Sequence, residues 1–335
     1  MALVDERTQY LNLAQIDAAC REVAARLLVG REALIPALRR ELITVSANGL
    51  RASALGQGLF GPYAPRPGLL AVAGPGGTGK TYFGELLARV LYGEHFARHL
   101  IYVNCRAYLA ARAAPIPRAK LEAGPVAIVT LDGVEALAEL PPAAAVWADA
   151  LRSGRASLPA INERGEVTPV ELSFHRALVV AIANVARDKV LHVGFHPVAA
   201  RPVGQETADR IIRDDLARLL EGTLAEVFSQ ERWLILPPLD QSGMRRLVAL
   251  QLRSLAERLP RGSPPIEITE PAAQRLIDLA LASRSPNKTL SLVEVIQSVV
   301  EPPVNEALLA AAAPVPLRVR VSLRDGRPLA EVAHA

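Results

Sequence analysis

One segment constrains the fold of this chain more than any other: a glycine-rich loop between an apolar segment at 69–73 and an amphipathic one at 81–91. The loop comprises Gly74, Pro75, Gly76, Gly77, Thr78, Gly79, Lys80 and Thr81, in the pattern G-x-x-x-x-G-K-[ST]. Glycines let several backbone N–H groups point into one concavity, and the N-terminus of the following helix adds its positive dipole. In this pattern the lysine contacts the β- and γ-phosphates of a nucleotide, and the threonine hydroxyl binds magnesium. The loop therefore predicts a site for ATP with Mg²⁺.

Short apolar segments alternate with helical ones around this loop. Strands are expected at 69–73, 100–103, 126–131, 178–182 and 233–236. Helices are expected at 81–91, 143–151 and 209–228, after a helical region at 11–45; loops are expected at 46–68 and 109–125, and a hairpin at 155–172. Such alternation is typical of an α/β fold, a parallel sheet with helices on both faces.

The pattern changes near residue 240. Helices are expected at 242–259, 271–282 and 290–312, and two short strands at 317–323 and 328–332 flank Asp325-Gly326, a hairpin signal. We expect two domains: an α/β nucleotide-binding domain at 1–240, which includes the N-terminal helical segment, and a small, mostly helical domain with a C-terminal hairpin at 241–335.

An acid follows the third expected strand, where a magnesium-holding carboxylate is needed. Asp132 would bind the metal through water; the alternative is an aspartate that only caps a turn. Hydrolysis also needs a group that orients the attacking water. The next residue is Gly133, and the nearest glutamate is Glu135. The favoured interpretation of Glu135 is a surface residue at a helix start; it reaches the site only if the turn is remodelled.

Composition and charge limit the partners and the cellular location that we expect for this protein. The net charge of the 335 residues is +4 without a basic block, so nucleic acid is an unlikely partner. No uncharged apolar stretch is long enough for a membrane span, and the acidic N-terminus does not resemble a secretory signal. The only cysteines, Cys20 and Cys105, lack metal spacing, which favours a cytoplasmic protein. Cys105 is expected to be a buried structural thiol, and His192 and His196 to be loop residues without metal.

Several segments together resemble the AAA+ ATPases of the Clp type, in particular the second ATPase module of the ClpB disaggregases. The segments are LLVGREAL (27–34), GPGGTGKT (74–81), IYVNCRAY (101–108), VTLDGVEAL (129–137), LRSGRASLPAINERGEV (151–167), VVAIAN (179–184), LPPLDQ (236–241), EPPVNEALL (301–309) and VRVSLRDGRPL (319–329). The resemblance implies that Asn184 senses the γ-phosphate or the attacking water. It places Leu27, Leu28 and Val29 beside the adenine, and it makes the C-terminal domain a lid over the nucleotide.

The chain departs from this family at the positions that drive hydrolysis. Gly133 stands where the family has a second acid, and Ser229 falls where a neighbouring subunit's arginine is expected; Arg232 could replace that arginine only with a shift. The lid arginine falls near Lys288, and 109–125 is short and lacks the aromatic of the substrate-gripping loop. An arginine finger is worth about 10³–10⁵ in rate, so we expect nucleotide binding with weak or absent hydrolysis.

Three functions remain open. The first is a nucleotide-gated subunit of a protein assembly, formed by self-association or with a different protein. The second is a slow but genuine ATPase that remodels a protein partner, using Glu135 or a group from the partner. The third and weakest is a DNA-associated AAA+ regulator, because no DNA-reading segment is recognisable in the sequence.

Overall fold

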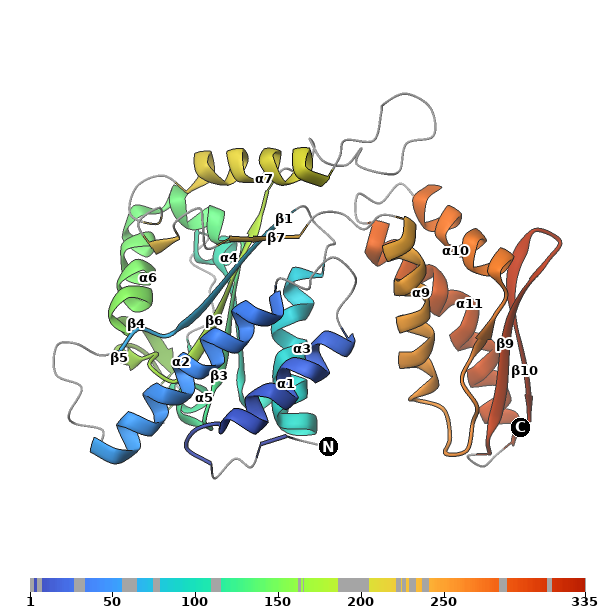
Figure 1. Ribbon diagram of the computed structural model, residues 1–335, viewed down its shortest axis with the longest axis horizontal. Helices are drawn as coiled ribbons and strands as arrows, with labels where there is room; N and C mark the ends of the chain where they lie inside the picture. Colours follow the sequence, from blue (N-terminus) through green and yellow to red (C-terminus); the bar gives the residue numbers. More distant parts are fainter. Residues whose placement is uncertain are drawn as a thin grey trace. The chain divides into compact units, whose positions relative to one another are not determined.

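The computed structural model describes most of the chain. It covers residues 3–4, 8–26, 34–55, 65–74, 79–109, 116–161, 164, 166–185, 205–220, 224, 227–228, 233–236, 241–282, 288–311 and 315–334. The described residues form two compact units, one ending at Leu236 and one beginning at Gln241. Each is described by itself below (Figure 1).

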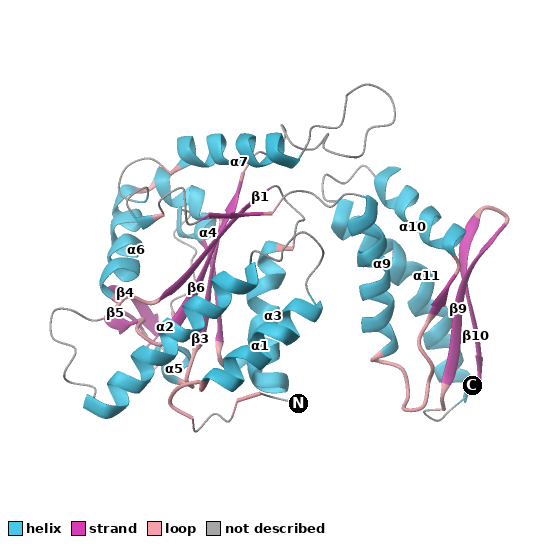
Figure 2. Ribbon diagram, viewed as in Figure 1, coloured by secondary structure: helices cyan, strands magenta, loops and turns pink. Residues whose placement is uncertain are grey.

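The first unit is built on a parallel five-stranded sheet with the order β2-β3-β6-β1-β7. Its strands are β1 (Gly68–Gly74), β2 (Leu100–Asn104), β3 (Ala127–Asp132), β6 (Ala177–Asn184) and β7 (Trp233–Ile235). Its helices are α1 (Leu13–Arg26), α2 (Leu34–Leu55), α3 (Lys80–Tyr92), η1 (Gly93–Arg98), α4 (Cys105–Leu109), α5 (Arg118–Glu122), η2 (Val134–Glu139), α6 (Pro141–Ser153) and α7 (Gln205–Leu219). Helices flank the sheet on both sides (Figure 2), so the predicted α/β class is confirmed.

The sheet is apolar because it is covered on both faces. Strand β3 is buried except for its last residue, Asp132, and β6 is buried except for its last residue, Asn184. Alternate residues of the central strands, such as Val72, Val180 and Ile182, join one core cluster with residues from α1, α2 and α3. Trp147 on α6 and Trp233 on β7 are buried in the core. The polar residues Asp132 and Asn184 therefore emerge where β3 and β6 end.

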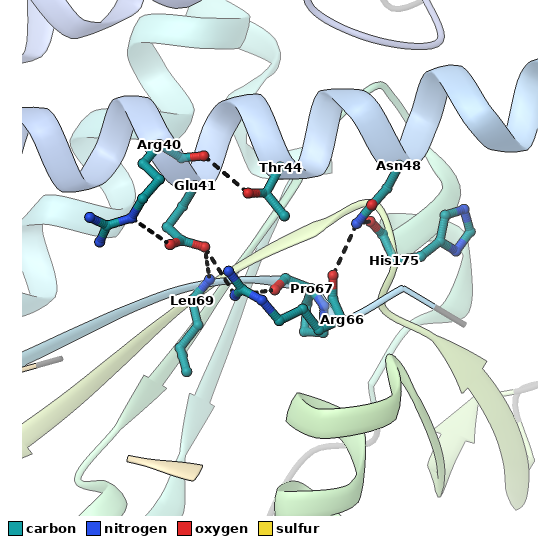
Figure 3. A network of polar contacts seen from close by, with 8 residues as sticks. All are labelled: Arg40, Glu41, Thr44, Asn48, Arg66, Pro67, Leu69 and His175. Carbon is teal, nitrogen blue, oxygen red and sulfur yellow. Dashed lines mark hydrogen bonds and ion pairs between the residues drawn. The ribbon is translucent and has the colours of Figure 1, made fainter. Parts of the chain in front are cut away.

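Helix α2 is longer than predicted and includes residues expected to form a loop. The cause is a buried polar network at the start of β1 (Figure 3). The amide of Asn48 donates to the carbonyl oxygens of Arg66 at 3.0 Å and His175 at 2.9 Å. Two turns earlier, the carboxylate of Glu41 accepts from Arg66 at 3.2 Å and from the backbone N–H of Leu69 at 3.1 Å. These long-range bonds stabilise a helical end that local sequence does not favour.

Several other elements of this unit differ from expectation. Helix α5 falls within 109–125, a segment expected to be mainly loop, and α7 ends at Leu219 rather than at 228. The expected hairpin is present as β4 (Arg155–Ile161) paired antiparallel with β5 (Val167–Ser173).

The second unit contains helices α9 (Gln241–Ala256), α10 (Glu270–Ala282) and α11 (Lys288–Ala311), and strands β8 (Glu267–Ile268), β9 (Leu317–Arg324) and β10 (Arg327–His334). The predicted hairpin is confirmed, since Asp325 and Gly326 both have positive φ, 49° and 74°, as a tight turn requires. Strand β8 was not expected; it pairs parallel with β9. No helix in the described parts of the chain is long and apolar enough to cross a membrane.

Candidate functional site

The sheet register brings polar residues together at one edge. Parallel strands end on the same side, and the register pairs Gly74 with Asn184 and Asn104 with Asp132. Helix α3 begins at this edge with Lys80 and Thr81. The edge therefore gathers the start of the phosphate-loop helix, Asp132 and Asn184, as the sequence predicted.

The described ends of the glycine-rich loop have the conformation that the motif needs. Gly79 is left-handed, with φ 79°, directly before α3. A Cβ at Gly74 would overlap the carbonyl oxygen of Leu236, so only glycine fits beside the end of β7. The ammonium of Lys80 donates to the carbonyl oxygen of Gly74 at 2.9 Å and is buried. A buried ammonium group at the start of this helix suits an anionic ligand, because phosphate oxygens are stronger acceptors for it than backbone carbonyls.

Asp132 is the centre of a hydrogen-bond cluster. Its Oδ2 accepts from the hydroxyl of Thr81 at 3.1 Å and from the hydroxyl of Tyr102 at 2.7 Å. Its Oδ1 accepts from the side-chain amide of Asn184 at 3.2 Å. Partial burial and Asp132 raise the pKa of Tyr102, so its hydroxyl is a neutral donor near pH 7. The alternative that Asp132 only caps a turn does not account for donors from three different elements.

The donor set fits magnesium. Mg²⁺ prefers oxygen ligands and is usually held by one or two carboxylates, waters and substrate phosphates. Thr81 offers a hydroxyl oxygen and Asp132 a carboxylate, 3.1 Å apart, beside the start of α3. Within the described ranges no three His, Cys, Asp or Glu side chains cluster as a phosphate-independent metal site would need.

Glu135 lies inside the site, and its interpretation as a surface residue is wrong. Only 8% of Glu135 is exposed, and its Oε2 accepts from the backbone N–H of Asn184 at 3.1 Å. Gly133 is left-handed, with φ 80°, and η2 follows it at once, so the chain turns inward and carries Glu135 beneath the sheet edge. Burial raises the pKa of Glu135, while the N–H of Asn184 and the charge of Arg106 oppose this effect.

Arg106 was not identified from the sequence as a site residue. Its guanidinium Nη2 lies 3.6 Å from Oε1 of Glu135, and its stem passes within 4.0 Å of the position of a Cβ on Gly133. Asn104 caps the start of α4, since its Oδ1 accepts from the N–H groups of Arg106 at 3.0 Å and Ala107 at 3.2 Å. Tyr102 was not identified from the sequence either. It lies near Asp132 because β2 pairs with β3 in this register, and the sequence alone does not give that register.

Cys105 is a structural thiol, as expected. It is fully buried, and burial, with Glu135 and Asp132 nearby, raises its pKa to about 12. The reactive thiolate is therefore absent near pH 7.

Some predicted residues lie outside the described part of the chain. These are Leu27, Leu28, Val29, Pro75, Gly76, Gly77, Thr78, His192, His196, Ser229 and Arg232, and the side chain of Lys288 also lies outside it. The adenine contacts and the trans-arginine assignments stay predictions.

Comparison with known proteins supports the fold. No protein-family model and no curated protein sequence matches the chain. Among solved structures it is similar to the Hsp104–ADP complex of S. cerevisiae, with a TM-score of 0.61 and 17% sequence identity over 95% of this chain. That alignment covers 52% of the Hsp104 chain, so the chain spans about half the length of that protein. Together with the sheet order and the mainly helical second unit, this likeness shows that the chain has the fold of the part of Hsp104 with which it aligns.

Proposed function

We propose that the protein binds ATP with Mg²⁺ at the edge formed by β1, β3 and β6, hydrolyses it weakly or not at all, and acts as a nucleotide-gated subunit of a protein assembly. The observation that carries the proposal is the bond from the Thr81 hydroxyl to Asp132. It joins the phosphate-loop helix to the acid at the end of β3. Phosphate-loop nucleoside triphosphatases hold magnesium beside the bound phosphates with such a pair.

Lys80 supports the binding of a triphosphate. Its ammonium is buried against the Gly74 carbonyl at the start of the loop, so it is already held near the site. The magnesium ligands would be Thr81 directly and Asp132 through water, and the metal would neutralise charge on the phosphates. The second unit, in residues 241–335, would act as the lid that the Clp resemblance implies.

Weak turnover follows from the groups next to Asp132. Gly133 has no side chain to orient water. Glu135, the nearest acid, already accepts from Asn184 N–H and faces Arg106. Ser229 also stands where the arginine is expected, so both the orientation of water and the stabilisation of charge by an arginine are reduced. The phosphate loop is complete, so binding of the nucleotide is retained.

Thermal melting tests the binding claim. At 100 times the dissociation constant, ATP with Mg²⁺ should stabilise the wild-type protein by about 2.7 kcal/mol. Lys80→Ala should lose this effect. Lys120→Ala is the matched control, because Lys120 also donates to backbone carbonyls, those of Ala97 and Leu100, at the opposite end of β2. An ATP-independent melting temperature in the wild type contradicts the proposal, as does full ATP stabilisation of Lys80→Ala.

A slow ATPase that remodels a protein partner is the second candidate, and the burial of Glu135 favours it. A desolvated carboxylate with a raised pKa is a better base than a solvated one. Single-turnover hydrolysis of ATP separates the two functions. If Glu135 orients water, Glu135→Gln should lower the rate by at least tenfold, and exposed Glu139→Gln on the same turn should not. Equal, background-level rates in all three proteins favour the gated subunit.

A further inference from the structure

Tyr102, on the edge strand β2, contacts Asp132, the carboxylate proposed to hold magnesium. Its hydroxyl donates to Oδ2 of Asp132 at 2.7 Å, the shortest bond that this carboxylate makes to a described residue. The residue is nevertheless 51% exposed. An exposed aromatic ring on an edge strand contributes little to the core, so the hydroxyl is the notable part of this side chain.

Counting acceptors shows what the hydroxyl does. A carboxylate oxygen has about two lone-pair sites. At Oδ2 of Asp132 both are used, one by Thr81 and one by Tyr102, while Oδ1 accepts from Asn184. Metal-bound waters need acceptor sites on this same carboxylate. The Tyr102 hydroxyl therefore competes with those waters for Oδ2.

We propose that Tyr102 is a positioning residue that caps Asp132 and must be displaced when a divalent cation binds with the nucleotide. The inference rests on the proposed function and deepens it, because it names a residue that sets the metal affinity of that site. The cap weakens metal binding, since its hydrogen bond has to be broken first. The exposed ring can turn into solvent without disturbing the core.

A purely supporting role for Tyr102 has the opposite consequence. If the hydroxyl were needed to orient Asp132, its removal would weaken metal binding. The carboxylate is already held at Oδ2 by Thr81 and at Oδ1 by Asn184, so its orientation does not depend on Tyr102.

The test is a titration of the full chain, saturated with ADP, with Mn²⁺ as the probe, followed by electron paramagnetic resonance. Tyr102→Phe should bind Mn²⁺ roughly 2- to 10-fold more tightly than the wild type, which is one hydrogen bond expressed as a binding ratio. Tyr10→Phe, which changes an exposed tyrosine on the segment before α1, should match the wild type. Affinity for ADP without metal should be the same in all three proteins. The near-ultraviolet tyrosine difference spectrum on adding Mn²⁺ should be present in the wild type and absent in Tyr102→Phe.

If Tyr102→Phe binds Mn²⁺ as tightly as the wild type or more weakly, the proposal that Tyr102 caps Asp132 is wrong. The proposed function still stands in that case, provided that the wild type binds ADP and Mn²⁺. Failure of the wild type to bind ADP at all overturns both, and the metal-free titration reveals it before any variant is compared. A melting temperature of ligand-free Tyr102→Phe close to that of the wild type excludes misfolding as the cause of any difference.

Discussion

The carboxylate of Glu135 is fixed to the end of β6 by Asn184, whose backbone N–H donates to Glu135 Oε2 at 3.1 Å. The bond joins two residues that are 49 positions apart. Because Glu135 is buried with Asp132 and Arg106 beside it, the charge of this carboxylate affects both the stability of the fold and the chemistry of the site.

Glu135 should make stability depend on pH. Its pKa is raised in the folded protein, so the folded state holds this proton more tightly than the unfolded state. The stabilisation is fully present below the pKa of the unfolded chain and is lost as the pH rises through the raised folded value. Denaturant unfolding should therefore show wild type losing stability relative to Glu135→Gln across this range. Glu139→Gln should follow the wild-type pH dependence, and parallel curves for wild type and Glu135→Gln would contradict the assignment.

Gly133 should be intolerant of side chains because its backbone is left-handed, with φ 80°. Gly133→Ala should lower the free energy of unfolding by about 1 kcal/mol, measured with denaturant. Gly326, with φ 74° and no atom within 4 Å of its Cβ position, provides a matched strain control in the C-terminal hairpin. We expect Gly326→Ala to cost about the same, while only Gly133→Ala alters nucleotide affinity. If Gly133→Ala is as stable as the wild type, the backbone at the start of η2 does not have the left-handed conformation.

Restoring the acid at this position should raise hydrolysis only modestly. Gly133→Glu would place a second carboxylate near Glu135, whose Oε1 is 3.7 Å from the Cβ position, and beside Arg106. If Ser229 occupies the trans-arginine position, as proposed, Gly133→Glu with Ser229→Arg should exceed the single variant in steady-state phosphate release. Fast turnover by Gly133→Glu alone would mean that Ser229 is not a limiting loss.

Asn48 should be critical for the first unit. The residue is 2% exposed, and its side-chain amide donates to the carbonyl oxygens of Arg66 and His175. Asn48→Ala leaves these acceptors without that donor, and we expect a loss of about 2–3 kcal/mol in denaturant unfolding. Arg51→Ala, exposed on the same helix, should change stability by less than about 0.5 kcal/mol. Equal effects of the two variants would contradict the anchoring role of the network.

Much of the fold was predictable because its signals are local. The apolar strands, the loop before α3 and the Asp325-Gly326 turn each follow from a few neighbouring residues. The extension of α2 was not predictable, since it depends on Asn48 reaching His175, 127 positions away. The residues of the candidate site fall into the same two groups, those with a local sequence signal and those without one. Lys80, Thr81, Asp132 and Asn184 belong to sequence motifs, whereas Tyr102, Arg106 and the inward turn of Glu135 depend on strand register and on the backbone of Gly133.

Assembly should depend only weakly on the nucleotide. In the Clp-type ATPases that the sequence resembles, an arginine from one subunit is expected to reach the γ-phosphate of its neighbour, and a serine at the proposed equivalent position, Ser229, would not provide that charge. A lost charge-assisted bond is worth about 1.5–3 kcal/mol at each interface. Native mass measurement without nucleotide, with ADP and with an ATP analogue should give similar oligomer distributions. A sharp change from monomer to hexamer on adding ATP alone would identify another arginine, first Arg232, as the replacement.

The fate of bound ATP tests the central claim most directly. Protein with Mg²⁺ and radiolabelled ATP can be passed through a desalting column, and the retained nucleotide identified while free phosphate is measured. We predict about one nucleotide per chain, retained mostly as intact ATP, with phosphate release near background and with no retention by Lys80→Ala. Absence of retained nucleotide in the wild type would contradict the binding site, and rapid, Lys80-dependent release of phosphate would contradict weak turnover.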